Sequence, residues 1–242
     1  MNLIEFKQRR KEGSEDLELR IISTFSKKRT VAIHQFGSAA KGKEDEFSDK
    51  DLWITFEDKA LNKVIEERDN LYSSIGRVVI KFEPPQNAPS GGIYSLVIHE
   101  TNYGLFHVDY YLVSKSKTKI LPESKVIFGD DILPRGDWFE DQEKLKIPGL
   151  KSPASRIDFL ICMSFIGVKY VVRKIKPFLD FLIKEYNTNR SEYFPELEEI
   201  KNGYDFETVR FILDQHYSIA GEQQKAAIEK VKVYLSETEA LY

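Results

Sequence analysis

The sequence predicts an α+β protein, with an N-terminal mixed β-sheet and flanking helices followed by a C-terminal α-helical bundle. Short β-branched and aromatic runs alternate with turn residues over the first 150 or so positions. From Ser152 onward the apolar residues recur with helical spacing instead. The composition, 41% hydrophobic and 31% charged over 242 residues, is that of a globular chain with a sizeable core.

Five runs in the first half carry the strand signature, because β-branched and aromatic residues dominate them and Gly, Pro, Asn or Ser bound them. They are Thr30–Phe36, Asp51–Phe56, Arg77–Phe82, Ile93–His99 and Leu105–Val113. Apolar residues near a 3.6-residue period predict helices over Ser14–Lys27 and Lys59–Ile75. Residues 83–92, rich in Pro and Gly, are expected to form a loop, and residues 100–104 a five-residue hairpin connection.

The second half is predicted to be helical. We expect a long helix with a break or kink at Pro177, three shorter helices after it, and helix stops at Asn202-Gly203 and Gly221. The four predicted helices are Ser155–Tyr186, Ser191–Lys201, Phe206–His216 and Glu222–Leu241. The chain is thus expected to divide into an α/β domain (1–120), a loop-rich connection (121–150) and a helical domain (151–242).

Charge and cysteine content exclude several classes of protein. With 36 Lys and Arg against 39 Asp and Glu, the net charge of −3 argues against a dedicated nucleic-acid-binding protein. The single cysteine, Cys162, cannot form an intramolecular disulfide, so a reducing cytoplasm fits best. No apolar run approaches the roughly 18 residues of a membrane span. We therefore expect a soluble, cytoplasmic protein with neither a membrane nor a nucleic acid as its partner.

One stretch combines residues that suit phosphate and metal chemistry. A predicted strand ends at Gly37-Ser38, where a turn leads into a short helix, and Asp49-Lys50-Asp51 opens the next strand. Glycine lets the backbone approach a ligand, and the amides of a helix start suit a phosphate. Asp49 and Asp51 are two apart on a strand, so their side chains leave the same face. Carboxylate oxygens are the ligands that Mg²⁺ prefers.

A third acid lies on a later predicted strand. Asp109 interrupts an otherwise apolar run, where an unpaired charge would be costly. If that strand lies beside the strand that begins at Asp51, three carboxylates come together and repel one another unless cations bind there. His107 shares a strand face with Asp109 and could orient it, although a structural histidine is favoured. The aromatic residues Tyr94, Tyr110 and Tyr111 are expected mainly in the core.

These motifs resemble the nucleotidyltransferase superfamily of DNA polymerase β. The superfamily's signature is Gly-Ser, a spacer of about ten residues, Asp-x-Asp and a later strand-borne acid, which here are Gly37-Ser38, Asp49, Asp51 and Asp109. The resemblance covers roughly residues 30–113 and makes residues 1–120 the catalytic domain. The size and the helical second half resemble the aminoglycoside and lincosamide nucleotidyltransferases, although Arg173-Lys174 stands where many of them have Arg-Gly.

The resemblance implies Mg²⁺-dependent transfer of a nucleoside monophosphate, AMP from ATP, to a hydroxyl of a small molecule, with an antibiotic as one candidate acceptor. Asp49, Asp51 and Asp109 would hold two Mg²⁺ ions, and Asp109 would also serve as general base. The expected nucleotide-binding residues are Gly37, Ser38, Lys41, Lys43, Lys169 and Arg173. Whether the enzyme is a monomer or a homodimer stays open at this stage.

Other interpretations stand beside this one. Lys41 and Lys43 fit solvated loop lysines equally well, and Lys169 and Arg173, four apart on a helix, fit a solvated stripe. The same Gly-Ser and Asp-x-Asp elements occur in protein adenylyltransferases of the toxin–antitoxin kind. A non-catalytic nucleotide-binding module is the alternative from a different class, and three intact acids argue against it.

Overall fold

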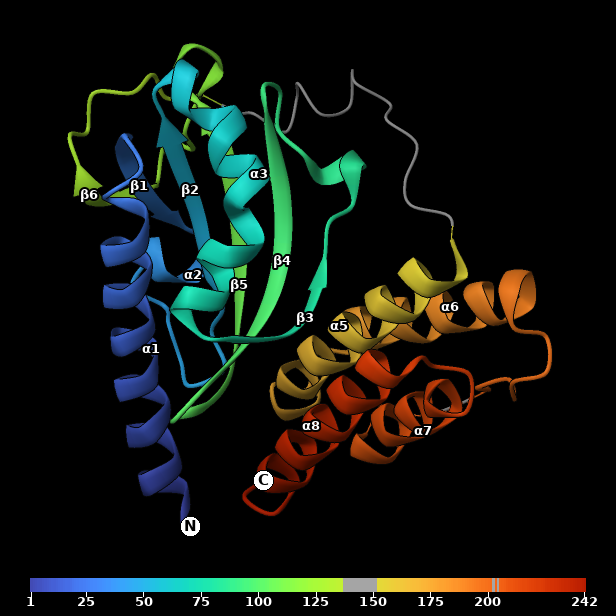
Figure 1. The fold of residues 1–242 in the computed structure, drawn as a ribbon. Coiled ribbons are helices and arrows are strands. Elements are labelled where there is room, and N and C mark those ends of the chain that lie inside the picture. The colour runs from blue at the N-terminus through green and yellow to red at the C-terminus, as the bar shows by residue number, and fades with distance from the viewer. Residues whose placement is uncertain (137–151, 202, 204) are drawn as a thin grey trace. The chain divides into compact units, whose positions relative to one another are not determined.

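The computed structural model describes residues 1–136, 152–201, 203 and 205–242. These residues divide into two compact units, one before and one after residues 137–151 (Figure 1). The first unit is a mixed β-sheet with flanking helices, and the second is helical, which confirms the predicted α+β class. In the described ranges, no helix has both the length and the apolar content that crossing a membrane requires.

The sheet of the first unit has six strands in the order β3-β4-β5-β2-β1-β6. The strands are β1 (Thr30–Phe36), β2 (Lys50–Phe56), β3 (Arg77–Phe82), β4 (Gly92–Thr101), β5 (Gly104–Ser114) and β6 (Lys125–Gly129). Neighbouring strands pair antiparallel except at the centre, where β2 and β5 run parallel. This parallel pair brings together two segments that lie more than 50 residues apart in the sequence, as the pairing of Asp51 with Asp109 shows.

Two helices, α1 (Leu3–Phe25) and α3 (Asp58–Ile75), cover one face of the sheet (Figure 1). The apolar core under them includes Leu52 and Ile54 of β2 and Val108 and Tyr110 of β5. Because side chains alternate along a strand, the residues between these point to the opposite face. On β2 and β5 that face carries Asp51, Trp53, His107, Asp109 and Tyr111.

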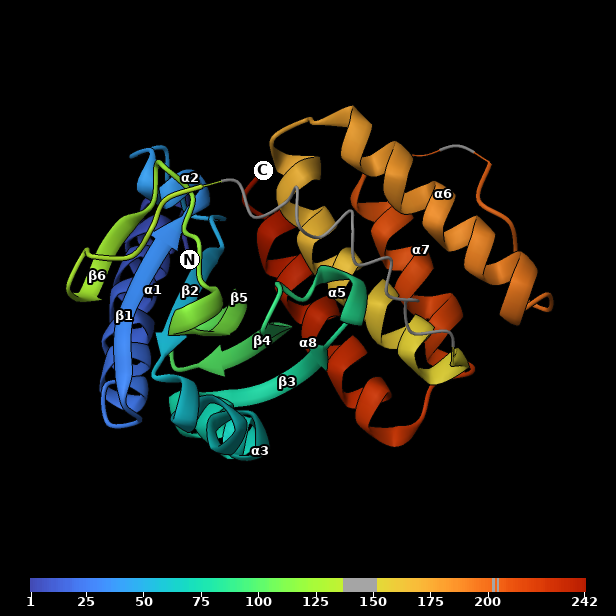
Figure 2. The same ribbon diagram turned by 90° about the horizontal axis from the view of Figure 1, so that it is seen from above.

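The second unit contains the helices α5 (Pro153–Val172), α6 (Lys176–Tyr193), α7 (Phe206–Tyr217) and α8 (Glu222–Glu239), drawn in yellow to red in Figure 2. Helix α5 packs against each of the other three. Its Leu160 joins Leu182 and Tyr186 of α6 and Ile212 of α7 in a shared core. The helical domain expected from the sequence is therefore a bundle organised around α5.

All five predicted strands and both predicted N-terminal helices are present, with different bounds for most of them. Helix α1 begins at Leu3, eleven residues before its predicted start at Ser14. The connection between β4 and β5 is shorter than expected, since only Asn102 and Tyr103 separate them. The sequence interpretation missed β6, which lies inside the expected loop-rich connection and pairs with β1 as a short edge strand.

The predictions about the second half are confirmed only in part. The segment Ser155–Tyr186 is interrupted, as the predicted break or kink implied, but the break separates two helices, α5 and α6, and lies at Lys174, which has a φ of 55°. Pro177 follows the break and lies in the first turn of α6, where its missing N–H costs nothing. Gly221 caps the start of α8 and does not end α7, which stops at Tyr217.

The helix predicted over Ser191–Lys201 is also wrong. Helix α6 ends at Tyr193, and residues 194–201 are not helical. Pro195 explains the end of the helix, because proline disfavours helical geometry in the residue before it. Phe194, Leu197 and Ile200 are buried, so the spacing that resembles a helix reflects packing of a non-regular segment against the bundle. The predicted stop at Asn202 lies outside the described residues.

A polar cluster at the end of β3 holds this edge of the sheet to α3. The carboxylate of Glu83 accepts hydrogen bonds from Arg68 at 2.8 and 2.9 Å and from Ser95 at 2.7 Å. The ammonium of Lys81 lies 2.9 Å from the same carboxylate. Burial alone would raise the pKa of Glu83, but the hydrogen bonds from Arg68, Ser95 and Lys81 outweigh it and lower the pKa to about 2.

This lowered pKa predicts a pH-dependent contribution to stability. A carboxyl group whose pKa falls on folding stabilises the fold above its unfolded-state pKa and loses that effect as the pH drops toward the folded-state value. Glu83→Gln should therefore lower the free energy of unfolding by about 3 kcal/mol at pH 7. The difference between wild type and variant should shrink steadily between about pH 5 and pH 2.

Urea unfolding of both proteins at several pH values measures this difference. Glu57→Gln is the control, because Glu57 is exposed and its carboxylate lies 3.3 Å from the ammonium of Lys115. A difference for Glu83→Gln that stays constant from pH 7 to pH 3 would contradict the assignment.

Candidate functional site

The register of the central parallel strands brings the predicted acids together. Asp51 of β2 lies directly opposite Asp109 of β5, and Lys50 lies opposite Val108. Continued by one residue, the same register sets Asp49, just before β2, beside His107. Asp51, His107 and Asp109 point to the face away from α1 and α3, because the residues between them belong to the core under these helices. The prediction that the strand carrying Asp109 lies beside the strand that begins at Asp51 is confirmed, since β5 pairs with β2.

The side chain of His107 bridges two of the acids. Its Nε2 lies 2.9 Å from Oδ1 of Asp109, and its Nδ1 lies 3.3 Å from Oδ2 of Asp49. One ligand atom from each of Asp49, His107 and Asp109 falls within 4.8 Å of the others, so the three residues form a candidate metal site. Asp51 is not part of this set of three, although it is the strand partner of Asp109.

The two carboxylates determine the charge state of the histidine. Burial by itself would lower the pKa of His107, but the charge and hydrogen bond of Asp109, together with the nearby carboxylate of Asp49, raise the pKa to about 10. In the described structure an imidazolium thus offsets the repulsion between Asp49 and Asp109. The carboxylates of Asp49 and Asp109 therefore favour a positive charge between them.

Gly37 forms the bend that faces Asp51. Its φ of +71° lies in the left-handed region that favours glycine. A Cβ at this position would lie 2.0 Å from Oδ2 of Asp51, so the backbone and the carboxylate are in direct contact. The helix that follows, α2 (Gly37–Ala40), is a single turn and leads into the loop before β2. The Gly37 bend therefore lies against the Asp51 carboxylate, and a role of Ser38 stays a prediction.

Helix α1 anchors the loop that precedes Asp49. Arg10 is almost fully buried, and its guanidinium lies 3.9 Å from the ring centroid of Phe106. Its Nε donates to the carbonyl of Glu46 at 2.9 Å, and its Nη1 donates to the carbonyl of Leu105. One side chain thus ties the loop to the start of β5.

The end of the same loop is fixed by a local turn. The carboxylate of Asp45 accepts from the amide of Phe47 and from the hydroxyl of Ser48, each at 3.0 Å. On the helix-covered face, Lys50 is buried and forms a 2.8 Å ion pair with Glu18 of α1. The backbone on both sides of Asp49 is therefore held in place.

Two of the four predicted nucleotide-binding cations, Lys41 and Lys43, lie in the first unit just after α2. Lys41 is half exposed and lies 3.4 Å from Glu123, and Lys43 is exposed. Lys169 and Arg173 belong to the second unit, where Lys169 is buried in α5 with its ammonium 5.2 Å from the ring centroid of Tyr170. Arg173 follows the last residue of α5. A role of these residues in nucleotide binding stays a prediction.

Sequence reasoning undervalued two residues of the site. His107 was favoured as a structural histidine and Tyr94 as core, yet both contact the carboxylate of Asp109. The hydroxyl of Tyr94 lies 2.6 Å from Oδ1 of Asp109. The alternation His107-x-Asp109 carried a signal, because an acid in an apolar strand needs donors nearby. The sequence around Tyr94 has no comparable pattern, because its hydroxyl reaches Asp109 only through the pairing of β4 with β5.

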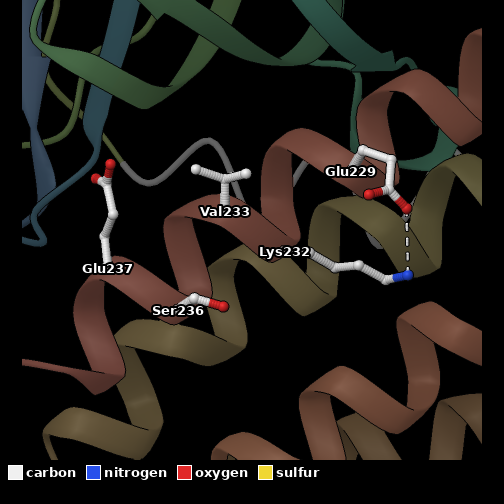
Figure 3. Close-up of a pocket in the computed structure, with 5 residues that line it drawn as sticks. All are labelled: Glu229, Lys232, Val233, Ser236 and Glu237. Carbon is white, nitrogen blue, oxygen red and sulfur yellow. Dashed lines mark hydrogen bonds and ion pairs between the residues drawn. The ribbon is translucent and has the colours of Figure 1, made fainter.

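A shallow pocket on α8 is lined by Glu229, Lys232, Val233, Ser236 and Glu237 (Figure 3). The ammonium of Lys232 turns toward Glu229, 3.3 Å away, and also lies 2.7 Å from Asp214. All five lining residues come from one helix, and the charge of Lys232 is already matched by these acids. The cluster around Asp109, with its buried histidine between two acids, is the stronger candidate site.

Neither a scan against models of known protein families nor a search of curated proteins gives a match for this chain. The function therefore has to be argued from the site itself. His107 lies between the carboxylates of Asp49 and Asp109. A third carboxylate, that of Asp51 on β2, lies opposite Asp109, and the Gly37 bend lies against it. This arrangement can hold a divalent cation and accept a proton from a bound hydroxyl.

Proposed function

We propose that this chain is a metal-dependent nucleotidyltransferase that moves a nucleoside monophosphate, AMP from ATP, to a hydroxyl of a small molecule. An aminoglycoside or a lincosamide is the proposed class of acceptor. One observation carries the proposal: Asp51 and Asp109 are partners on adjacent parallel strands, and the Gly37 bend contacts the Asp51 carboxylate. This is the arrangement that the resemblance to the DNA polymerase β superfamily implies.

The residues present fit a divalent cation. Carboxylate oxygens of Asp49 and Asp109 lie within 4.8 Å of one another, beside a nitrogen of His107, and carboxylate oxygens are the ligands that suit Mg²⁺ or Mn²⁺. We propose that Asp49, Asp51 and Asp109 hold two Mg²⁺ ions, with His107 as a neighbour of the ligands. When bound, the cations neutralise charge on the phosphates and acidify the attacking hydroxyl.

The chain's own residues then have distinct roles. Asp109 accepts the proton of the acceptor hydroxyl as general base. The hydroxyl oxygen forms a bond to the α-phosphorus, while the bond from that phosphorus to the pyrophosphate oxygen breaks. Pyrophosphate leaves with the electron pair of that bond. The backbone around Gly37-Ser38 and the loop lysines Lys41 and Lys43 are proposed to bind the triphosphate.

Pyrophosphate release from each nucleoside triphosphate, measured with Mg²⁺ and a panel of aminoglycosides and lincosamides, tests this function. The expected result is release that depends on an acceptor, prefers ATP, and yields a product heavier by one nucleoside monophosphate in mass spectrometry. Removal of the metal with a chelator should stop release. Nucleotide binding without turnover over the whole panel would contradict the proposal and favour a binding module.

A further inference from the structure

We infer that Tyr94 and His107 are positioning residues that hold one oxygen of Asp109, Oδ1, and so reserve the other oxygen, Oδ2, for the cation and the acceptor hydroxyl. This inference rests on the proposed function and deepens it, because it assigns separate tasks to the two oxygens of the acid proposed as general base.

The two hydrogen bonds converge on a single atom. Oδ1 of Asp109 lies 2.6 Å from the hydroxyl of Tyr94 and 2.9 Å from Nε2 of His107. A carboxylate oxygen only accepts, so the tyrosine O–H and the histidine N–H are the donors. Each carboxylate oxygen has about two lone-pair sites, and these two donors occupy those of Oδ1. Among the residues that the structure describes, none donates a hydrogen bond to Oδ2.

Both donors come from rigid parts of the sheet. His107 lies on β5, two residues before Asp109, and its side chain is 6% exposed. Tyr94 lies on β4, opposite Tyr111 and two residues from the partner of Asp109, Leu96. Its buried ring packs on Tyr111 with a centroid distance of 4.8 Å. Both donors are therefore buried and packed within the sheet.

The short contact with Tyr94 has a chemical consequence. Hydrogen bonds from a hydroxyl to a carboxylate are charge-assisted and stronger than neutral ones. Two such bonds on one oxygen fix the plane of the carboxyl group, and with it the direction of Oδ2. Outer partners of this kind orient metal ligands, and their loss typically weakens metal binding about 10- to 100-fold.

Tyr94→Phe tests the inference, because it removes only the hydroxyl and keeps the ring that packs on Tyr111. We expect Mn²⁺, titrated into the purified protein and followed by electron paramagnetic resonance, to bind about tenfold more weakly. We also expect the kcat of acceptor-dependent pyrophosphate release to fall about tenfold, with the KM for the nucleotide within about twofold of wild type.

Tyr110→Phe is the matched control. It removes a buried hydroxyl from the same sheet, but on the helix-covered face, where that hydroxyl lies 3.0 Å from Nε2 of His99. Both variants should lower the unfolding midpoint, whereas only Tyr94→Phe should weaken Mn²⁺ binding. As a second variant, His107→Gln keeps an amide donor and should bind Mn²⁺ more tightly than His107→Leu.

The results separate this inference from the proposed function. If Tyr94→Phe binds Mn²⁺ as tightly as wild type while Asp109→Asn does not bind it, the metal site stands and the positioning role of Tyr94 is overturned. If wild type and Asp109→Asn bind Mn²⁺ equally, or if neither binds it, the metal site itself fails and the inference falls with it.

Discussion

Asp109→Asn is expected to lower Mg²⁺-dependent pyrophosphate release about 10³-fold or more. The substitution removes the charge that would hold the cation and the basic oxygen that would accept the hydroxyl proton. Loss of a metal's charge stabilisation costs several kcal/mol of transition-state energy, and about 1.4 kcal/mol corresponds to a factor of ten in rate. Asparagine has nearly the same size as aspartate, and its side-chain oxygen can still accept from Tyr94.

Two further measurements make this result specific. Circular dichroism and the unfolding midpoint should show that the variant is folded. Asp69→Asn is the control, because Asp69 is an exposed acid of α3 that pairs with Lys81 at 2.6 Å, away from the site. It should release pyrophosphate at the wild-type rate. Full activity of Asp109→Asn would remove Asp109 from both the metal site and the proton transfer.

The strands around the site were predictable because their local signals are strong. Thr30–Phe36 and Arg77–Phe82 match their predicted bounds, because β-branched and aromatic residues dominate both runs and turn residues bound them. The spacing from Gly37-Ser38 to Asp49 and Asp51 was likewise visible in the sequence. The pairing of Asp51 with Asp109 was a conditional prediction, because the order of strands in a sheet is set by the whole fold.

The remaining features depend on tertiary contacts. Tyr94 reaches Asp109 only because β4 pairs with β5, and no local pattern distinguishes it from a core tyrosine. The buried Arg10 contacts Phe106 across almost 100 residues of sequence, and its role in holding the loop before Asp49 was invisible to periodicity. Phe194, Leu197 and Ile200 are spaced as on one face of a helix, but they are buried in a segment that is not helical, because Pro195 ends α6 at Tyr193.

Gly37→Ala carries the second large expected effect. A Cβ at this position would lie 2.0 Å from Oδ2 of Asp51, whereas such contacts almost never fall below 3.0 Å. The carboxylate or the bend therefore has to move by about 1 Å, and a misplacement of that size in an active site costs roughly 10²-fold in rate. We expect pyrophosphate release to fall by about that factor under saturating nucleotide.

Gly42→Ala separates this crowding from backbone strain. Gly42 has a φ of +63°, close to the +71° of Gly37, but a Cβ there would lie within 4 Å of no heavy atom of the described residues beyond its own chain neighbours. Both variants bear the left-handed cost of about 1–2 kcal/mol in stability, and Gly37→Ala bears the crowding against Asp51 in addition, so urea unfolding should show the larger loss for Gly37→Ala. Only Gly37→Ala should lose turnover, because only there does the methyl group displace an acid of the site. Equal turnover in the two variants would mean that the contact between the bend and Asp51 has no part in the reaction.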